Sequence, residues 1–283
     1  MREVTTDNAG GVQNWHGVDL TKAHSARVHN YWLGGRDNFA VDRKAAEAAL
    51  AANPGMIHAI RANRAFLVRA VRYLAGEEGV RQFLDIGTGL PTANNTHEVA
   101  QSVAPESRVV YADNDPMVLA HARALLSSTP EGACAYLNAD LRDPDLILAE
   151  AARTLDFAQP VAIMLLGVLQ QVLDADDPYG VVARLVDALP PGSFLAITHP
   201  ASDVDPRSAA EAARRLNSMM AQQRQLRCEA EVARFFGDLE LVEPGLVQVA
   251  EWRPDPADAR QPGGTRTFRT GRGGRWAGVA RKT

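Results

Sequence analysis

The sequence is poor in cysteine, in excess charge of one sign and in long apolar runs. Its 283 residues include two cysteines, Cys134 and Cys228, which are far apart. They form neither a disulfide framework nor a zinc-ligand spacing, which suits a reducing cytosol. The formal net charge is −4, so no overall basic field would attract nucleic acid, and none is expected as a partner.

Apolar runs are short as well. The most apolar run, at 161–169, is far below the roughly 20 residues that are needed to cross a bilayer. Residues 1–7 contain no apolar signal core. We therefore expect a soluble cytoplasmic protein with no membrane partner. The hydrophobic content of 46% and charged content of 23% are sufficient for one large α/β domain with an accessory segment.

Strands and helices are predicted to alternate through the middle of the chain. The predicted strands are 81–86, 108–112, 134–138, 161–165 and 194–198. The predicted helices between them are 92–103, 116–126, 144–153 and 177–189. This alternation indicates parallel βαβ units in a doubly wound, Rossmann-like sheet.

The last part of the chain changes pattern. Helices are expected at 206–227 and 229–236, followed by strands at 246–252 and 276–280 with no helix between them. These two strands would pair antiparallel at the sheet edge and give a mostly parallel, seven-stranded sheet with an antiparallel last strand. Their connection, 253–275, is rich in Pro, Gly and Arg and is predicted to be mobile.

The chain is expected to have three parts. Residues 1–20 are polar and predicted to be mobile. Residues 21–76 form a helical cap or lid, with helices at 42–52 and 56–74 that have apolar residues at helical spacing. Residues 77–283 form the ligand-binding α/β domain.

An aromatic pair, a glycine pair and a polar residue lie close together in the cap: Tyr31, Trp32, Gly34, Gly35 and Asn38. One interpretation is a helix end with Gly34 as its C-cap, packing the aromatic rings on the main domain. Another is a lid over a ligand. The two interpretations are compatible.

The predicted helix at 56–74 also carries polar residues off its apolar stripe. Arg61 and Asn63 lie in the segment 61–64. They either solvate a helix face or point toward a ligand, and the pattern leaves both open.

The glycine turn after the first strand gives the main functional signal. Asp85 is followed by Gly87, Thr88 and Gly89, with Thr92 where a dinucleotide fingerprint would have its third glycine. The N–H groups of the helix that follows are expected to point at the ligand. Asp85 would repel a pyrophosphate, whereas it would attract the ammonium and sulfonium groups of S-adenosylmethionine (SAM).

Acidic residues also end the next two strands. Asp113, with Asn114 after it, lies where a ribose-binding acid is expected, and Asp115 already fits the role of helix N-cap. Asp140 can accept a hydrogen bond from an adenine amino group, with Leu141 against the ring. Carboxyl ends of parallel strands share one sheet edge, so these acids are expected to converge there.

On these residues the chain resembles the class I SAM-dependent methyltransferases. Segment 84–89 is similar to their glycine motif, Asp113 to their ribose acid and Asp140 to their adenine-side acid. Segment 166–171, which contains Gly167, resembles the stretch after their fourth strand. The resemblance implies that residues 77–283 are a SAM-binding methyltransferase domain and that Gly167 contacts the cofactor.

A closer resemblance covers nearly the whole chain after residue 20. Segments 26–39, 61–64 and 85–91 together are similar to a bacterial family of S-adenosyl methyltransferases that long carried only an unknown-function label. This resemblance implies a fold and a cofactor. It implies no particular acceptor.

Two functions follow as hypotheses: methyl transfer to a small-molecule N or O acceptor, or a SAM-binding regulatory or assembly protein without turnover. His199 is the best-placed candidate base, although a structural histidine is the alternative. Tyr31, Trp32, Gln170 and Gln171 are candidates for the acceptor pocket. No metal is expected.

Overall fold

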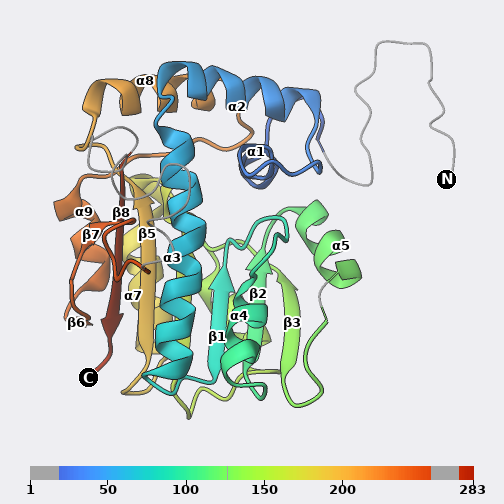
Figure 1. Cartoon of the computed structure of the whole chain (residues 1–283), viewed down its shortest axis with the longest axis vertical. Helices are drawn as coiled ribbons and strands as arrows, with labels where there is room; N and C mark the ends of the chain where they lie inside the picture. Colours follow the sequence, from blue (N-terminus) through green and yellow to red (C-terminus); the bar gives the residue numbers. More distant parts are fainter. Residues whose placement is uncertain (1–18, 126, 256–273) are drawn as a thin grey trace, which may run out of the picture.

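A mixed eight-stranded sheet forms the centre of the computed structural model, which describes residues 19–125, 127–255 and 274–283 (Figure 1). The strand order is β3-β2-β1-β4-β5-β8-β6, and β7 also pairs with β8. The predicted mobile segments at 1–20 and 253–275 lie largely outside the described residues.

The strands are β1 (Gln82–Ile86), β2 (Arg108–Asp113), β3 (Ala133–Asn138), β4 (Ala162–Leu166), β5 (Phe194–Pro200), β6 (Glu240–Leu241), β7 (Val247–Gln248) and β8 (Arg275–Arg281). The α-helices are α1 (Ser25–Trp32), α2 (Ala40–Ala52), α3 (Met56–Gly76), α4 (Thr96–Val103), α5 (Pro116–Leu125), α6 (Pro144–Ala151), α7 (Pro178–Asp187), α8 (Pro206–Asn217) and α9 (Glu229–Ala233). Single 3₁₀ turns are η1 (Leu169–Gln171), η2 (Asp174–Asp176) and η3 (Arg234–Phe236).

The five predicted parallel strands are present as β1 to β5. The end of the sheet differs from the prediction. The last strand, β8, is antiparallel as expected, but it lies inside the sheet, between β5 and the short strands β6 and β7. The strand expected at 246–252 is reduced to β7, and β6 was not predicted.

Alternating residues of the strands feed two separate cores. Leu84 and Ile86 of β1 point to one face, where they join a buried cluster with α6 and α7. Phe83 points to the other face, where it packs with the apolar stripe of α3. Successive residues of a strand point to opposite faces, and both faces of this sheet are covered, so the parallel strands carry apolar residues on both sides.

A cap made of α1, α2, α8 and the beginning of α3 covers the carboxyl end of the sheet (Figure 1). Its core contains Trp32, Ile60 and Leu216, and Ala23 forms a bridge with Met220. The cap thus combines segments that are far apart in sequence. The predicted boundary between the cap and the α/β domain, after residue 76, assigns all of α3 to the cap. In the structure, Phe66 and Leu74 of α3 pack against the sheet.

Two predicted helices are too long. The helix expected at 206–227 ends at Asn217, because the side chain of Asn217 exchanges hydrogen bonds with the backbone of Arg224 and holds a chain reversal. The helix expected from residue 92 begins at Thr96. No helix in the described ranges combines the length and apolarity that a membrane span requires.

Candidate functional site

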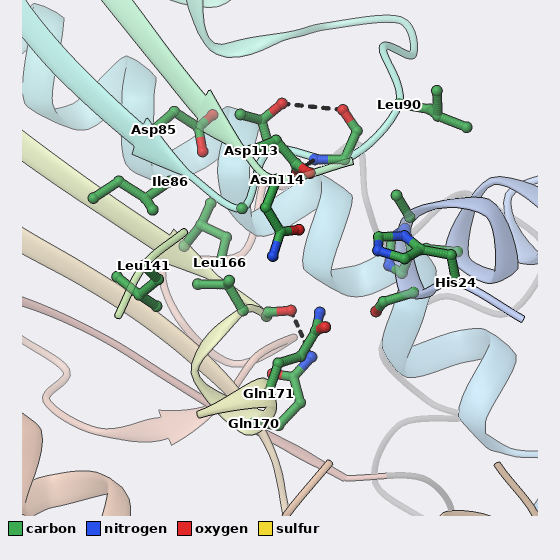
Figure 2. Close-up of a pocket in the computed structure, with 18 of the residues that line it drawn as sticks. His24, Asp85, Ile86, Leu90, Asp113, Asn114, Leu141, Leu166, Gln170 and Gln171 are labelled. Atoms are coloured by element: carbon green, nitrogen blue, oxygen red, sulfur yellow. Dashed lines mark hydrogen bonds between the residues drawn. The ribbon is translucent and has the colours of Figure 1, made fainter. Parts of the chain in front are cut away.

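A cavity lies between the carboxyl ends of the strands and the cap. Together with the solvent space at its open mouth, it has a volume of about 1240 Å³. Figure 2 shows Asp85, Asp113, Asn114, His24 and Gln170 around this space.

The glycine turn forms part of the cavity wall. Gly87 and Gly89 have φ angles of +72° and +67°, which favour residues without a side chain. A Cβ on Gly87 would lie 2.3 Å from Cγ2 of Val168, so the turn also packs closely on the loop after β4. The N-terminus of α4 is absent from the described lining, contrary to the sequence-based expectation, because α4 begins four residues later than predicted.

A chain of hydrogen bonds joins three strand ends. Gly89 N donates to Asp113 Oδ2 at 2.9 Å (Figure 2). Asp115 N donates to Asp113 Oδ1 at 2.9 Å. Asn114 Nδ2 donates to Asp140 Oδ2 at 2.8 Å. The expected convergence of these acids is present, and each Asp113 oxygen retains a free lone pair for a ligand. Asp115 accepts from Met117 N, as the cap prediction required.

Asp85 is a buried acid in this wall. Its side chain accepts a 2.6 Å hydrogen bond from Thr96 Oγ1, and 4% of the residue is exposed. Burial raises the pKa of Asp85 to about 6. Burial also raises the pKa of Asp113. The deep end of the cavity therefore favours a ligand that brings positive charge.

Asp140 is bound more tightly to protein than the sequence suggested. Arg142 Nη1 lies 3.0 Å from Asp140 Oδ1, and Arg142 Nη2 donates to Gln171 O at 2.6 Å. This ion pair connects the end of β3 to the loop after β4. Leu141 is buried and lines the cavity next to Asp140.

The loop after β4 closes the floor of the cavity. Gly167 N donates to Thr198 O, and Gln170 Nε2 donates back to Gly167 O (Figure 2). Gln170 and Gln171 line the cavity, as expected for a pocket wall. The buried Oε1 of Gln170 has no partner among the described residues, so it is available to a ligand donor.

Basic residues line the side of the cavity under the cap, among them His29, Arg64, Arg224 and Arg275. Arg64 belongs to the segment 61–64, for which a ligand-facing position was left open, whereas the other three were not predicted. Burial and the charges of the three arginines lower the pKa of His29 to about 3, so His29 is neutral at ordinary pH. The four residues come from α1, α3, the loop after α8 and β8, and no local motif indicates that they meet.

The predicted lid residues divide into two groups. Trp32 and Asn63 line the cavity. Asn63 Oδ1 accepts from Thr198 Oγ1 at 2.6 Å, which fixes the start of α3 on β5. Tyr31 instead donates to Glu47 at the surface, and Arg61 is exposed. These last two assignments are therefore wrong: neither side chain lines the cavity.

Gly34, Gly35 and Asn38 shape a turn and do not line the cavity. Gly34 follows the end of α1 with a φ angle of +82°, in agreement with the C-cap interpretation. Gly35 packs against Asn30, and Asn38 Nδ2 donates to Asn30 Oδ1 at 2.9 Å. Asn30, which does line the cavity, is the residue that this turn positions.

His199 is not placed to act as a base. It is 0% exposed and lies outside the cavity lining. Its Nε2 lies 3.1 Å from Nη1 of the buried Arg227, and its Nδ1 lies 3.0 Å from Pro200 O. Burial and nearby arginines lower the pKa of His199 to about 3. The structural interpretation therefore replaces the catalytic one.

Within the described residues, no group of three or more His, Cys, Asp or Glu side chains could hold a metal ion. His97, which precedes Glu98, is buried, and its Nδ1 lies 2.8 Å from Tyr111 Oη. It is therefore a packing residue of α4.

Comparisons with known proteins agree with this geometry. A family model described as S-adenosyl methyltransferase matches residues 12–283. A DUF574 family protein from Streptomyces avermitilis MA-4680 is 46% identical, with a TM-score of 0.87, over 93% of this chain and 98% of that one. A protein assigned provisionally as a methyltransferase, from Thermobifida fusca YX, is 44% identical, with a TM-score of 0.81, over 94% of this chain and 97% of that one. No curated protein matches the sequence.

Proposed function

The chain belongs to the S-adenosyl methyltransferase family, and we propose that it transfers the methyl group of SAM to a nitrogen or oxygen atom of a small-molecule acceptor. One observation carries the acceptor part of this proposal. The cavity that the strand-end acids line is also lined, on the cap side, by Arg64, Arg224 and Arg275. Such a space is what a second small molecule needs next to the cofactor.

The residues present fit SAM. Asp113 has free lone pairs toward the cavity for the two ribose hydroxyls, and Asp140 with Leu141 offers an acid and an apolar surface for adenine. Gly87 and Gly89 let the backbone approach closely. Asp85 supplies negative charge for the methionyl ammonium. When bound, SAM supplies a methyl group that is already activated by the sulfonium.

The protein then has to align the acceptor and keep water away. SAM would supply its methyl carbon to a nitrogen or oxygen lone pair of the acceptor, and the electron pair of the broken carbon–sulfur bond would stay on sulfur. The proton that the acceptor loses leaves to solvent or to a side chain. Trp32, Asn63 and Gln170 surround the space in which this alignment would occur.

Two histidines line this space, and because His24 Nδ1 already lies 2.8 Å from Asp115 Oδ2, His29 is the one whose ring we assign to the acceptor. It faces the cavity, whereas His199 is enclosed by Arg227 and Pro200. Since the pKa of His29 is lowered to about 3, the ring is neutral and can accept a hydrogen bond from an acceptor N–H or O–H. If the acceptor is an amine that binds in its unprotonated form, its lone pair is already free, so it needs only this orienting hydrogen bond and no catalytic base.

We place this reaction in the cytoplasm and on a small molecule rather than on nucleic acid. The net charge of −4 supports the second point, because it provides no general attraction to phosphate backbones.

The proposal is tested by measuring methyl transfer with mixtures of metabolites, because the acceptor is not identified. The purified protein is incubated with SAM and bacterial metabolite extracts, and S-adenosylhomocysteine (SAH) is quantified. We expect SAH to form with at least one extract and to be lost in Asp113→Ala. Tight SAM binding without product from any extract would contradict transfer and would favour a SAM-binding regulatory or assembly role. Absence of SAM binding would contradict the cofactor assignment itself.

A further inference from the structure

Two arginines on the cap side of the cavity, the buried Arg275 and the half-buried Arg224, have no acidic partner among the described residues. Arg275 is 6% exposed, and its Nε has no hydrogen-bond partner among the described residues. The buried Nε of Arg224 is equally unpartnered there. Burial lowers the pKa of Arg224 to about 10, and burial with the charge of Arg224 lowers the pKa of Arg275 to about 9. Both remain cations at neutral pH.

The backbone places Arg275 at the floor of the cavity. It is the first residue of β8 and pairs in register with Pro200, at the end of β5. Its Nη1 lies 3.4 Å from Thr198 Oγ1, and a Cβ on Gly167 would lie 2.6 Å from the same Nη1. The guanidinium therefore lies directly against the carboxyl end of β4, where the loop that carries Gln170 begins.

Arg224 approaches the same point from the cap. Its backbone is held by the side chain of Asn217, so the residue has a fixed position at the end of α8. Both arginines also border a smaller, mainly apolar cavity of about 580 Å³ between α3 and α8. Asp205 is the acid of that lining, and its side chain accepts from Ser208 N at the start of α8.

Two neighbouring cations, one buried and one half-buried, with no anion among the described residues are unfavourable, because each has lost hydration and each repels the other. Guanidinium groups match carboxylate and phosphate oxygens with paired hydrogen bonds. The cofactor has one carboxylate of its own, and Arg64 lies nearer to the glycine-turn end. Arg64 donates to Ala93 O and Asn95 Oδ1, and its environment includes the charge of Asp85. Arg275 and Arg224 are left for a second anion.

We propose that the methyl acceptor carries an anionic group, a carboxylate or a phosphate, that Arg275 and Arg224 bind beside Gly167. This inference rests on the proposed methyltransferase function, since it assigns the substrate class of the same site. The anion would be held at the end of β4, and the acceptor atom would extend from it toward the strand-end acids that hold the cofactor.

Binding of simple anions to the SAH-saturated protein tests this directly. Benzoate and phenyl phosphate are titrated by calorimetry, with benzamide as the uncharged probe. We expect both anions to bind at least about tenfold more tightly than benzamide. The two anions distinguish a carboxylate from a phosphate preference. Equal binding of benzamide and both anions would overturn the proposal.

Variants then locate the site. Arg275→Gln should weaken the binding of the preferred anion by at least tenfold, and Arg224→Gln should do the same. Arg275→Lys keeps a positive charge at the same position of β8, so this variant should retain part of the anion affinity. Arg72→Gln on the exposed face of α3 is the matched control and should bind as the unaltered protein does. Unchanged anion affinity in both glutamine variants would overturn the proposal.

SAH affinity separates this inference from the proposed function. We expect SAH to bind Arg275→Gln and the unaltered protein equally. If Arg275→Gln loses SAH affinity as strongly as anion affinity, the arginines hold the cofactor carboxylate and the inference is wrong. If the unaltered protein does not bind SAH, it is the proposed function that fails. As an independent readout, the acceptor-containing fraction of an active extract should be retained on an anion exchanger at pH 8, and its passage through the column would contradict an anionic acceptor.

Discussion

The two sides of the cavity have opposite charge, and they differ in whether their residues come from consecutive strands or from distant parts of the chain. The cofactor side is acidic and consists of consecutive strand ends that carry Asp85, Asp113 and Asp140. The side that we propose for the acceptor, called the acceptor side below, is basic, and its Arg224 and Arg275 come from a loop of the cap and from β8. The acids of the first side are held by hydrogen bonds to neighbouring turns, whereas the guanidinium Nε atoms of the second have no partner in the described structure.

This contrast indicates how the protein separates two tasks. The cofactor side is already organised, because Asp113 and Asp140 accept hydrogen bonds from their own turns and Asp85 accepts one from Thr96 of α4. The acceptor side keeps unneutralised charge until a ligand arrives. A site of this kind favours an acceptor of one charge class while its cofactor contacts remain the same for any acceptor.

Asp113→Ala should have the largest effect that is confined to the cofactor side. It removes charge-assisted hydrogen bonds to the ribose, each worth about 1.5–3 kcal/mol. SAM affinity measured by calorimetry should fall by about 100-fold, whereas benzoate or phenyl phosphate affinity should not change. Asp113→Asn, which can still accept from Gly89 N, controls for the loss of the turn. SAM affinity that is the same in the alanine variant would remove Asp113 from the cofactor site.

A pH titration separates the sides without mutation. The pKa of Asp85 is raised to about 6, whereas those of Arg275 and Arg224 stay at about 9 and 10. Because the Asp85 carboxylate must be ionised to attract an ammonium, SAM affinity should fall about tenfold for each pH unit below 6. The affinity of benzoate should be flat from pH 6 to 8. Parallel pH profiles for the two ligands would contradict the division.

The same shift predicts a stability effect with a defined sign. The pKa of Asp85 is higher in the folded protein than the ordinary value of 3.8, so folding favours the protonated acid. Its contribution to stability is complete below about pH 4 and is lost as pH rises through 6. Asp85→Asn should therefore stabilise the ligand-free protein at pH 7 by on the order of 2 kcal/mol while weakening SAM binding. Thermal unfolding at pH 4 and pH 7 tests this, since the gain should disappear at pH 4.

Two alanine variants compare the glycines of the cofactor side. A Cβ at Gly87 would overlap the Val168 side chain, whereas a Cβ at Gly89 would meet no atom within 4 Å. Both positions have positive φ, which costs alanine about 1 kcal/mol. Gly89→Ala should lose about that amount of unfolding free energy, and Gly87→Ala about 2–4 kcal/mol. Equal losses in denaturant unfolding would mean that the Val168 contact does not matter.

Two histidine variants give the smallest expected difference. His199→Ala removes the acceptor of a buried Arg227 N–H, so it should lower stability by about 1–3 kcal/mol and leave the pH profile of turnover unchanged. His29→Ala should slow turnover with little loss of stability, because His29 faces the cavity. An altered pH–rate profile in His199→Ala that Arg227→Ala does not share would return a catalytic role to His199.

The predictable part of the site is the part that is local in sequence. Asp85, Asp113 and Asp140 each end a strand, and parallel strands bring their carboxyl ends to one edge whatever the loops do. The five parallel strands were predictable for the same reason, since apolar runs alternate with helical patterns. The closing strands were not, because β6 and β7 have two residues each and take their positions from β8.

The acceptor side could not be predicted because its residues meet only in three dimensions. The helical pattern placed Arg224 inside a long helix, whereas Asn217 ends that helix and turns the chain. Tyr31 and Trp32 are neighbours in sequence but lie about 100° apart around α1, so one faces Glu47 and the other the cavity. Nothing local in residues 25–32 indicates which of the two faces inward.

The position of β8 inside the sheet has a consequence for the order in which the molecule is built. During synthesis the residues of the cofactor side, from Asp85 to Asp140, emerge well before Arg224, and Arg275 follows after that. Until β8 inserts beside β5, the end of β5 has no neighbour on that side and Arg275 cannot reach Gly167. A growing chain therefore acquires the groups for the methyl donor first, and the acceptor side is the last part of the site to be assembled.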